Sequence, residues 1–309
     1  MSATIVDDKE ALRAKARARF AAAGLCGDPS KSNPATPGPS GALSSAPFAI
    51  DFDPRAVGAR NGAQSMYQGT LAATLLDCDL VSAILPAAMD LAPLFDPAQT
   101  PTQHPVLYLL GRQEDPLGLL NGATVTIPGA VPYNELILLI PFAVRKGGAS
   151  RWHSFAARMY LDESVAIGIG DGLYAYSKEW GDFDWFGDLA EIRSVGITIF
   201  EAEVTELGGW MSAANAAMAL PGFLDATRIL EMPIVGYNRL RGYVRSFFEW
   251  DYTLAEVAPA RSLHRFHREF VPGMQPWVAL GYLASAENAA FKLRNVRWRL
   301  STDLPSIPF

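Results

Sequence analysis

This chain of 309 residues contains few lysines, histidines and cysteines. It has six lysines, four histidines and two cysteines. Two cysteines, Cys26 and Cys78, are too few for a disulfide framework, so we expect plain thiols in a reducing compartment. A cytoplasmic location is therefore predicted.

The chain also lacks an excess of positive charge and a long apolar run. Its formal net charge is −6 and its pI is about 5.3, which disfavours nucleic acid as a partner. The most apolar run, at 135–144, has the length of a strand and contains a proline, whereas a membrane-spanning helix needs about 20 apolar residues. The N-terminus lacks the apolar core and cleavage site of a secretory signal. We expect neither a nucleic-acid partner nor membrane insertion.

The chain has enough apolar sequence for one large domain, and an N-terminal segment of different composition precedes that domain. Half of the residues are hydrophobic. Residues 1–26 predict a helical arm, with the helix at 8–24. Residues 27–46 are rich in proline, glycine and serine and predict a linker. The globular domain is expected at 47–309. The basic face of the arm would dock on a neighbouring subunit or, more simply, face solvent.

Many short apolar segments separated by glycine, proline and asparagine predict a strand-rich domain. Strands are expected at 106–110, 123–127, 135–144, 154–161, 195–204, 237–249, 262–271 and 293–300, and helices at 79–85, 215–219, 222–230 and 279–290. This order indicates the α+β class, mainly antiparallel, as a sheet or barrel with minor helices.

Lys178 stands out because of its aromatic surroundings. It lies in GLYAYSKEWG, positions 172–181. An ammonium group that is removed from water loses solvation, so burial favours the neutral amine. A neutral amine is a nucleophile and can form a Schiff base with a ketone or aldehyde. The alternative is a lysine whose stem packs on the aromatic rings while its charge stays in water.

Three segments, in order, resemble motifs of the acetoacetate decarboxylase family. MYLDESVAIGIGDGLYAYSKEWGDF at 159–183 is similar to a signature that begins with a strand ending in Y-L-D and ends in Y-P-K-K. VPYNELILLIPFAV at 131–144 is similar to the G-P-Y-x-E strand, and LVSAILPAAMDLAP at 80–93 to the helix and turn before it. The resemblance covers about residues 60–200.

The resemblance implies a fold and a pair of catalytic residues. The fold is a cone-like closed antiparallel β-barrel with peripheral helices. Lys178 falls on the lysine that forms the Schiff base and would point into an apolar central cavity. Glu135 falls on the family's glutamate and would orient the substrate or transfer protons. The iminium is itself the electron sink, so no metal or organic cofactor is expected, and the family suggests a homo-oligomer.

The chain departs from the family pattern beside the lysine. The family's second lysine is Glu179 here, and its proline is Ser177. If the segment is extended, residues 178 and 179 point to opposite faces, so Glu179 would have little influence on Lys178. Burial against aromatic rings would then have to favour the neutral amine.

The candidates for substrate binding are Arg60, Gln113 and Tyr176. The family's active-site arginine would align near Tyr67, and Arg60 is the nearest candidate. A second family glutamate would align near Leu110, with Gln113 just beyond. Tyr176 and its aromatic neighbours Tyr174, Trp180, Trp185 and Phe186 are expected mainly as core residues that lower the polarity around the lysine.

Two further groups are weaker candidates. The residues Arg145, Lys146, Arg151 and His153 form a basic loop, more simply a solvated hairpin than an anion site. His264 and His267 have no matching ligand motif, so no metal site is expected.

Three functions are compatible with these observations. The first is a lyase that decarboxylates a small β-keto acid through a Schiff base on Lys178. The second is an aldolase or dehydratase that uses the same iminium on a 2-oxo acid. The third is a non-catalytic barrel that binds a small molecule. An enclosed apolar cavity that contains Lys178 close to Glu135 would favour the enzymes.

Overall fold

The computed structural model describes residues 62–92, 103–121, 123–147, 152–267, 277–280 and 290–302. The predicted helical arm, the linker, Arg60 and Arg151 lie outside these residues and stay predictions. Within them, no helix is long and apolar enough to cross a membrane.

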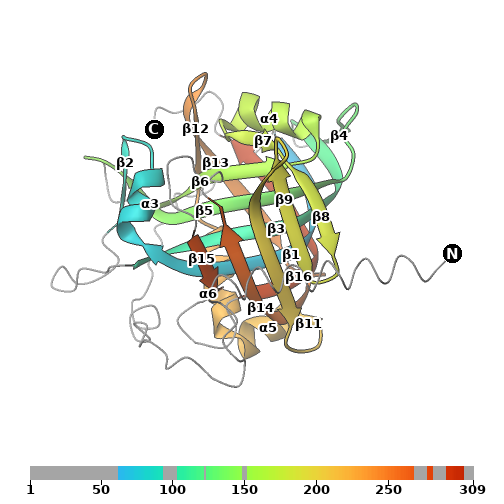
Figure 1. The fold of residues 1–309 in the computed structure, drawn as a ribbon. Coiled ribbons are helices and arrows are strands. Elements are labelled where there is room, and N and C mark those ends of the chain that lie inside the picture. Colours follow the sequence, from blue (N-terminus) through green and yellow to red (C-terminus); the bar gives the residue numbers. More distant parts are fainter. Residues whose placement is uncertain are drawn as a thin grey trace.

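Seven strands form a closed ring, in the order β1-β3-β5-β6-β12-β13-β16, and β16 pairs back with β1 (Figure 1). Neighbouring strands are antiparallel except β6 and β12, which are parallel. The predicted closed, mainly antiparallel barrel with peripheral helices is thereby confirmed. The bounds are β1 Gly62–Asp77, β3 Gln103–Leu120, β5 Tyr133–Arg145, β6 His153–Leu161, β12 Ile234–Asn238, β13 Gly242–Asp251 and β16 Ala290–Thr302.

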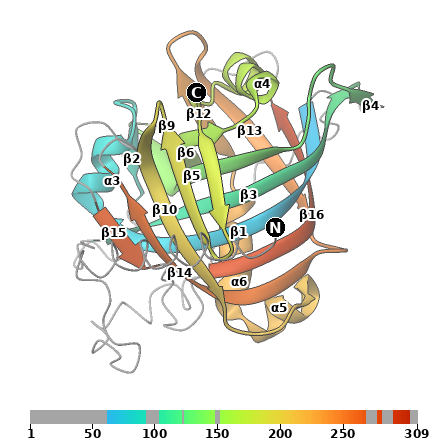
Figure 2. The same ribbon diagram turned by 45° about the vertical axis from the view of Figure 1, so that its right-hand side comes forward.

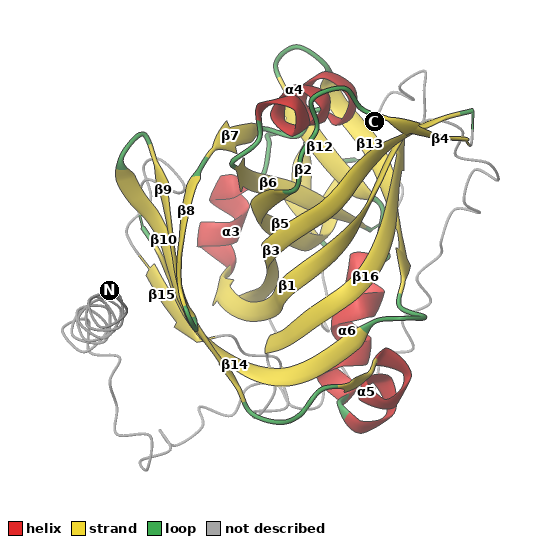
Figure 3. Cartoon of the chain, turned by 90° about the vertical axis from the view of Figure 1, so that its right-hand side faces the viewer, coloured by secondary structure: helices red, strands yellow, loops and turns green. Residues whose placement is uncertain are grey.

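A second sheet leaves the ring and packs on its outside (Figure 3). It starts at β14, which pairs with β16 on one side and with β10 on the other, and it continues through β9 to β8. These strands are β14 Glu256–Phe266, β10 Ile197–Glu206, β9 Leu189–Ser194 and β8 Asp182–Phe186. Short strands complete the described set: β2 Met89–Leu91, β4 Ala123–Thr126, β7 Lys178–Trp180, β11 Met211–Ser212 and β15 Trp277–Leu280.

Four helices lie around the described strands. They are α3 Cys78–Ile84, α4 Ser164–Tyr174, α5 Ala213–Ala219 and α6 Pro221–Leu230. Helix α4 covers one end of the barrel, and α5 and α6 lie at the other end (Figure 2). Helix α4 begins after Glu163, whose carboxylate accepts hydrogen bonds from the backbone N–H groups of Val165 and Ala166, which otherwise have no partner in the first turn.

The continuous apolar run of β5 reflects burial on both faces. Ile137 and Leu139 belong to the core inside the barrel, whereas Leu136 and Leu138 belong to the core between barrel and outer sheet. Because successive side chains of a strand alternate between faces, each face of β5 contributes to a different core. This parity also places Glu135 inside the barrel, on the same face as Ile137.

Some predicted elements are wrong. The sequence does not predict helix α4, because the three glycines of SVAIGIGDGLY lower the helix propensity of this segment. The single strand expected at 237–249 is a hairpin of β12 and β13, with a turn at 239–241. The helix expected at 279–290 is contradicted at its two ends, which lie in β15 and β16. The helices at 79–85 and 222–230 are confirmed within one or two residues.

Candidate active site

The pairing of β7 points Lys178 into the barrel. Strand β7 runs parallel to β6, with Lys178 opposite Met159 and Glu179 opposite Tyr160. Met159 belongs to the inner core and Tyr160 to the outer one. Lys178 therefore faces inward, and Glu179 faces outward, 3.9 Å from Arg158 Nη1. The prediction that residues 178 and 179 lie on opposite faces is confirmed.

Lys178 meets Glu135 inside the barrel. Its Nζ donates to Oε1 of Glu135 at 3.3 Å, and the two side chains are only 9% and 5% exposed. Removing two charges from water is costly, and such a pair is tolerated when further hydrogen bonds satisfy its remaining atoms. The two residues singled out as catalytic from the sequence are thus in direct contact.

The second oxygen of Glu135 is held by a hydrogen-bonded chain. Gln113 Nε2 donates to Glu135 Oε2 at 3.1 Å, and Trp298 Nε1 donates to Gln113 Oε1 at 2.8 Å. Gln113 and Trp298 are both buried. Because both ends of the Gln113 amide are occupied, this side chain orients Glu135 in the present structure.

The last turn of α4 fixes the position of the lysine. Asp171 Oδ1 accepts a hydrogen bond from the backbone N–H of Lys178 at 3.0 Å, and Asn238 Nδ2 donates to the Asp171 carbonyl at 2.8 Å. The stem of Lys178 crosses Gly170 so closely that a Cβ at that position would lie 2.3 Å from Cδ and 2.4 Å from Cε. The absence of a side chain at Gly170 is therefore what lets the lysine pass beneath the helix.

Four buried tyrosines surround this pair. Burial, and then the negative charge of Glu135, raise the pKa of Tyr67 and of Tyr133 well above the usual value. Burial likewise raises the pKa of Tyr174 and of Tyr176. All four are neutral phenols at physiological pH, and they make the environment of Lys178 and Glu135 poor in water.

The hydroxyls of the two stacked tyrosines differ. Tyr174 and Tyr176 stack with their ring centroids 5.6 Å apart. The hydroxyl of Tyr176 forms a hydrogen bond with that of Ser246. The hydroxyl of Tyr174 is buried and has no hydrogen-bond partner among the described residues.

A cavity of about 50 Å³ adjoins Lys178. Since about 10–15 Å³ suffices for one water molecule on this measure, the cavity has room for a molecule of only a few heavy atoms. It lies between the inner wall of the barrel and α4. The described residues that line it are mostly apolar, with Lys178, Glu163, Gln64 and the tyrosines Tyr133 and Tyr174 as polar members: Ala63, Gln64, Pro116, Leu117, Ile127, Ala130, Tyr133, Glu163, Val165, Ala166, Ile169, Gly170, Tyr174, Lys178, Trp298 and Leu300.

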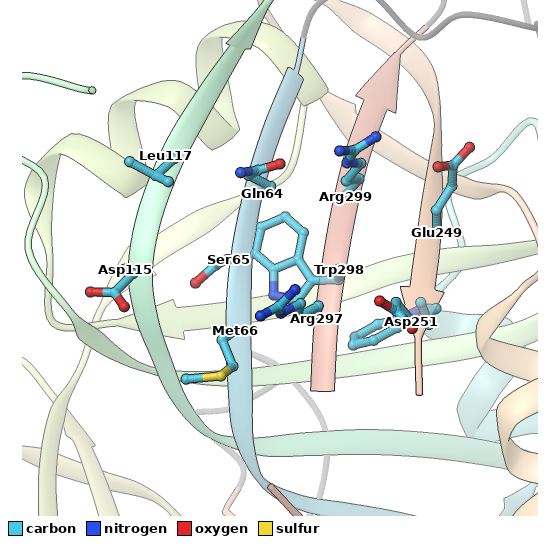
Figure 4. Close-up of a pocket in the computed structure, with 11 residues that line it drawn as sticks. Gln64, Ser65, Met66, Asp115, Leu117, Glu249, Asp251, Arg297, Trp298 and Arg299 are labelled. Atoms are coloured by element: carbon cyan, nitrogen blue, oxygen red, sulfur yellow. The ribbon is translucent and has the colours of Figure 1, made fainter. Parts of the chain in front are cut away.

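A larger groove of about 710 Å³ lies across β1, β3, β13 and β16 (Figure 4). Arg299 pairs across the strands with Glu249, and Arg297 with Asp251. These cross-strand pairs of opposite charge are ordinary features of a sheet surface. The groove shares Gln64, Leu117 and Trp298 with the lysine cavity but does not include Lys178 among its described residues.

The sequence-based site residues are only partly brought together. Lys178, Glu135 and Gln113 form one hydrogen-bonded group, and Tyr176 lies in the same inner core. Trp298 and Asp171 were missed. Trp298 is 185 residues from Gln113 in the sequence, so no local pattern could reveal it. Asp171 lies within the segment 159–183 that resembles the family signature, but its contact with the backbone of Lys178 depends on the end of helix α4.

The other candidate residues have structural partners. His264 lies inside the outer core, and His267 Nε2 lies 2.9 Å from Glu201 Oε2. No group of three or more potential metal ligands occurs among the described residues. Trp180 and Trp185 were expected in the core, but they are 49% and 44% exposed, so neither is a fully buried neighbour of Lys178.

Comparison with known proteins finds similarity at the level of structure only. No protein-family model matches the chain, and no curated protein matches it significantly. The enduracididine biosynthesis enzyme MppR, solved with pyruvate, is 12% identical with a TM-score of 0.47 and covers 78% of this chain and 88% of its own. Acetoacetate decarboxylase from Legionella pneumophila is 14% identical, with a TM-score of 0.45. The match covers 79% of this chain and 88% of the decarboxylase. An acetoacetate decarboxylase-like enzyme from Sphingomonas wittichii is 13% identical, with a TM-score of 0.44. The match covers 78% of this chain and 91% of that enzyme.

Proposed function

We propose that this protein is a divergent enzyme of the acetoacetate decarboxylase type that forms a Schiff base between Lys178 and a small oxo acid. The observation that carries the proposal is the contact of Lys178 with Glu135 beside a small, mostly apolar cavity. Such a cavity is the feature that distinguishes an enzyme from a barrel with an inert surface lysine. A buried amine next to a carboxylate has both the nucleophile and the proton acceptor that imine formation requires.

In the proposed reaction, Glu135 accepts a proton from the Lys178 ammonium, and the free electron pair of Nζ attacks the carbonyl carbon. The carbonyl oxygen takes up a proton, and the resulting carbinolamine loses water to give an iminium. With a β-keto acid, the bond to the carboxylate breaks and its electron pair moves to the iminium nitrogen. Carbon dioxide leaves, and the resulting enamine is protonated and then hydrolysed.

The carboxylate of Glu135 has the same electrostatic role before and after imine formation. The ammonium and the iminium both carry one positive charge at the same nitrogen. A fixed anion 3.3 Å away stabilises both in a medium of low polarity. Gln113 and Trp298 keep that carboxylate in place, so it does not have to reorganise during the reaction.

A second candidate reaction uses the same iminium for aldol addition, retro-aldol cleavage or dehydration of a 2-oxo acid. The observation in its favour is the replacement of the second lysine of the family pattern by the outward-facing, exposed Glu179. The chain thus lacks one part of the decarboxylase arrangement while it keeps the lysine and its carboxylate.

The test is borohydride trapping with acetoacetate, pyruvate and longer 2-oxo and 3-oxo acids, analysed by intact mass and peptide mapping. We expect a stable adduct on Lys178 with at least one acid, and none in Lys178→Ala. The acid that is trapped best, together with its released product, separates decarboxylation from aldol or dehydration chemistry.

The matched control is Lys292→Ala. Lys292 forms ion pairs with Asp188 and Glu206 at the surface, so its loss should leave trapping unchanged. An adduct that persists in Lys178→Ala, or the absence of an adduct with every acid, would contradict the proposal and favour a non-catalytic binding protein.

A further inference from the structure

Tyr174 has an unused hydrogen-bond donor at the candidate active site. Its side chain is 2% exposed and lines the same cavity as Lys178. Its hydroxyl has no partner within the described part of the chain. Leaving a buried hydroxyl without a hydrogen bond is unfavourable, so such a group in a native protein calls for an explanation. A ligand in the cavity would supply the missing acceptor.

The position of Tyr174 is fixed by its surroundings. It is the last residue of α4, and the following residue, Ala175, has a left-handed backbone conformation with φ of 54°. Its ring stacks on Tyr176. A Cβ at Gly236 would lie 2.4 Å from the Tyr174 carbonyl oxygen. The hydroxyl is therefore held on a rigid frame, as expected of a group that binds a ligand.

The charges near Tyr174 indicate which substrate atom it would bind. The cavity is also lined by Tyr133, whose pKa is raised by burial and by the charges of Glu135 and Glu163. Glu163 lines the cavity and Glu135 contacts Lys178 beside it, and these two carboxylates disfavour a substrate carboxylate in the same place. They do not repel the neutral carbonyl oxygen of a bound substrate, and the negative charge that this oxygen gains as the amine adds makes a hydrogen-bond donor beside it necessary.

We propose that the Tyr174 hydroxyl donates a hydrogen bond to the carbonyl oxygen of the substrate, the oxygen that becomes the carbinolamine hydroxyl. The inference rests on the proposed Schiff-base function. As Nζ of Lys178 bonds to the carbonyl carbon, the carbonyl electron pair moves to this oxygen. The phenol stabilises the developing charge and keeps its own proton.

The test compares Tyr174→Phe with Tyr252→Phe. Tyr252 also has a buried hydroxyl that lacks a partner among the described residues, but it packs against Phe223 and Trp250 and does not line the lysine cavity. Trapping rates are measured with the oxo acids. Calorimetry measures the binding of lactate and 3-hydroxybutyrate, which offer a hydroxyl at the same position but cannot form an imine.

We expect Tyr174→Phe to slow trapping about 100-fold, as for loss of one oxyanion donor, and to weaken hydroxy-acid binding roughly 5- to 10-fold. Its melting temperature should be unchanged or slightly higher, because an unsatisfied buried hydroxyl has been removed. Tyr252→Phe should match the wild type in trapping and binding. Lower stability together with unchanged binding would indicate a purely structural Tyr174 and would overturn the inference.

The two proposals fail in different ways. If the wild-type protein traps no acid, the Schiff-base function fails, and hydroxy-acid binding alone decides the role of Tyr174. Weaker binding in Tyr174→Phe than in Tyr252→Phe would then still support a ligand-binding hydroxyl. Equal binding in all three proteins, or no binding by the wild type, would overturn it.

Discussion

Two buried polar clusters, one inside the barrel and one between the barrel and the outer sheet, differ in charge and in access. The inner cluster consists of Lys178, Glu135, Gln113 and Trp298, and it adjoins the cavity beneath α4. The outer cluster lies between the barrel and the second sheet: Tyr108 and Ser262 share a hydrogen bond, and Ser262 Oγ lies 3.3 Å from His264 Nδ1.

The comparison shows that burial of polar residues does not by itself define an active site. Burial lowers the pKa of His264 to about 3, so the outer cluster is neutral at physiological pH, and its side chains are at most 1% exposed. It has two hydroxyls and a histidine, but they are buried too completely for a substrate to reach them. The inner cluster combines an ion pair with a cavity, and it is the one for which we propose chemistry.

After the complete loss of trapping expected for Lys178→Ala, the largest effect should come from Glu135→Gln. The amide keeps the shape and can still accept a hydrogen bond from Lys178, but it cannot take up a proton. Loss of a general base typically lowers rates by about 10²–10⁴-fold, and we expect trapping to slow by that range. The trapping rate is measured by quenching the reaction with borohydride at a series of times and determining the fraction of protein that carries the adduct. A rate within threefold of the wild type would mean that Glu135 is only a structural counter-ion.

Gly170→Ala should have the next largest effect, because the new Cβ would collide with the Lys178 stem. Displacing the amine by about 1 Å can cost roughly 100-fold in rate. We expect slower trapping in a folded protein, checked by circular dichroism. Gly172→Ala is the control, since no atom lies within 4 Å of a Cβ at that position and the same helix carries the change. Equal rates in the two variants would contradict the positioning role of Gly170.

In the outer cluster, His264→Phe should change acid stability and leave trapping intact. The pKa of His264 is about 3 in the folded state and 6.5 in its usual range, so the unfolded chain binds a proton that the folded protein does not. Stability is therefore lost as the pH falls below 6.5. Between pH 6.5 and pH 4, the wild type should lose on the order of 3 kcal/mol of unfolding free energy through His264, and the variant should not show this loss.

Urea titrations at several pH values measure the change. Some acid sensitivity should remain, because burial also lowers the pKa of His104, to about 4. A pH dependence identical to that of the wild type would show that His264 does not titrate differently on unfolding. Impaired trapping in this variant would show that the outer cluster influences the reaction at Lys178, contrary to our expectation that the two clusters act independently.

The smallest effect should come from Glu179→Gln, which changes the residue next to Lys178 in the sequence. Its carboxylate faces outward and is 3.9 Å from Arg158, at a half-exposed position. Exposed ion pairs contribute about 0–1 kcal/mol, so trapping and stability should stay close to wild type. A strong change in the trapping rate would show that Glu179 influences Lys178 through the strand.

The sequence alone determined the identity of the candidate nucleophile and its carboxylate. Lys178 and Glu135 could be selected because both fall on short motifs within single segments. The sequence also predicted that residues 178 and 179 point to opposite faces if their segment is extended. Helix α4 was missed because glycines lower local helix propensity, whereas its stability comes from packing against the barrel.

The tertiary structure alone decided how the site is assembled. Trp298 reaches Gln113 only because β16 closes the ring against β1. The stem of Lys178 fits only because α4 presents Gly170 above it, and Tyr174 borders the cavity only because α4 ends there. Local propensity and motifs act over a few residues, whereas a cavity is formed by segments that only ring closure brings together.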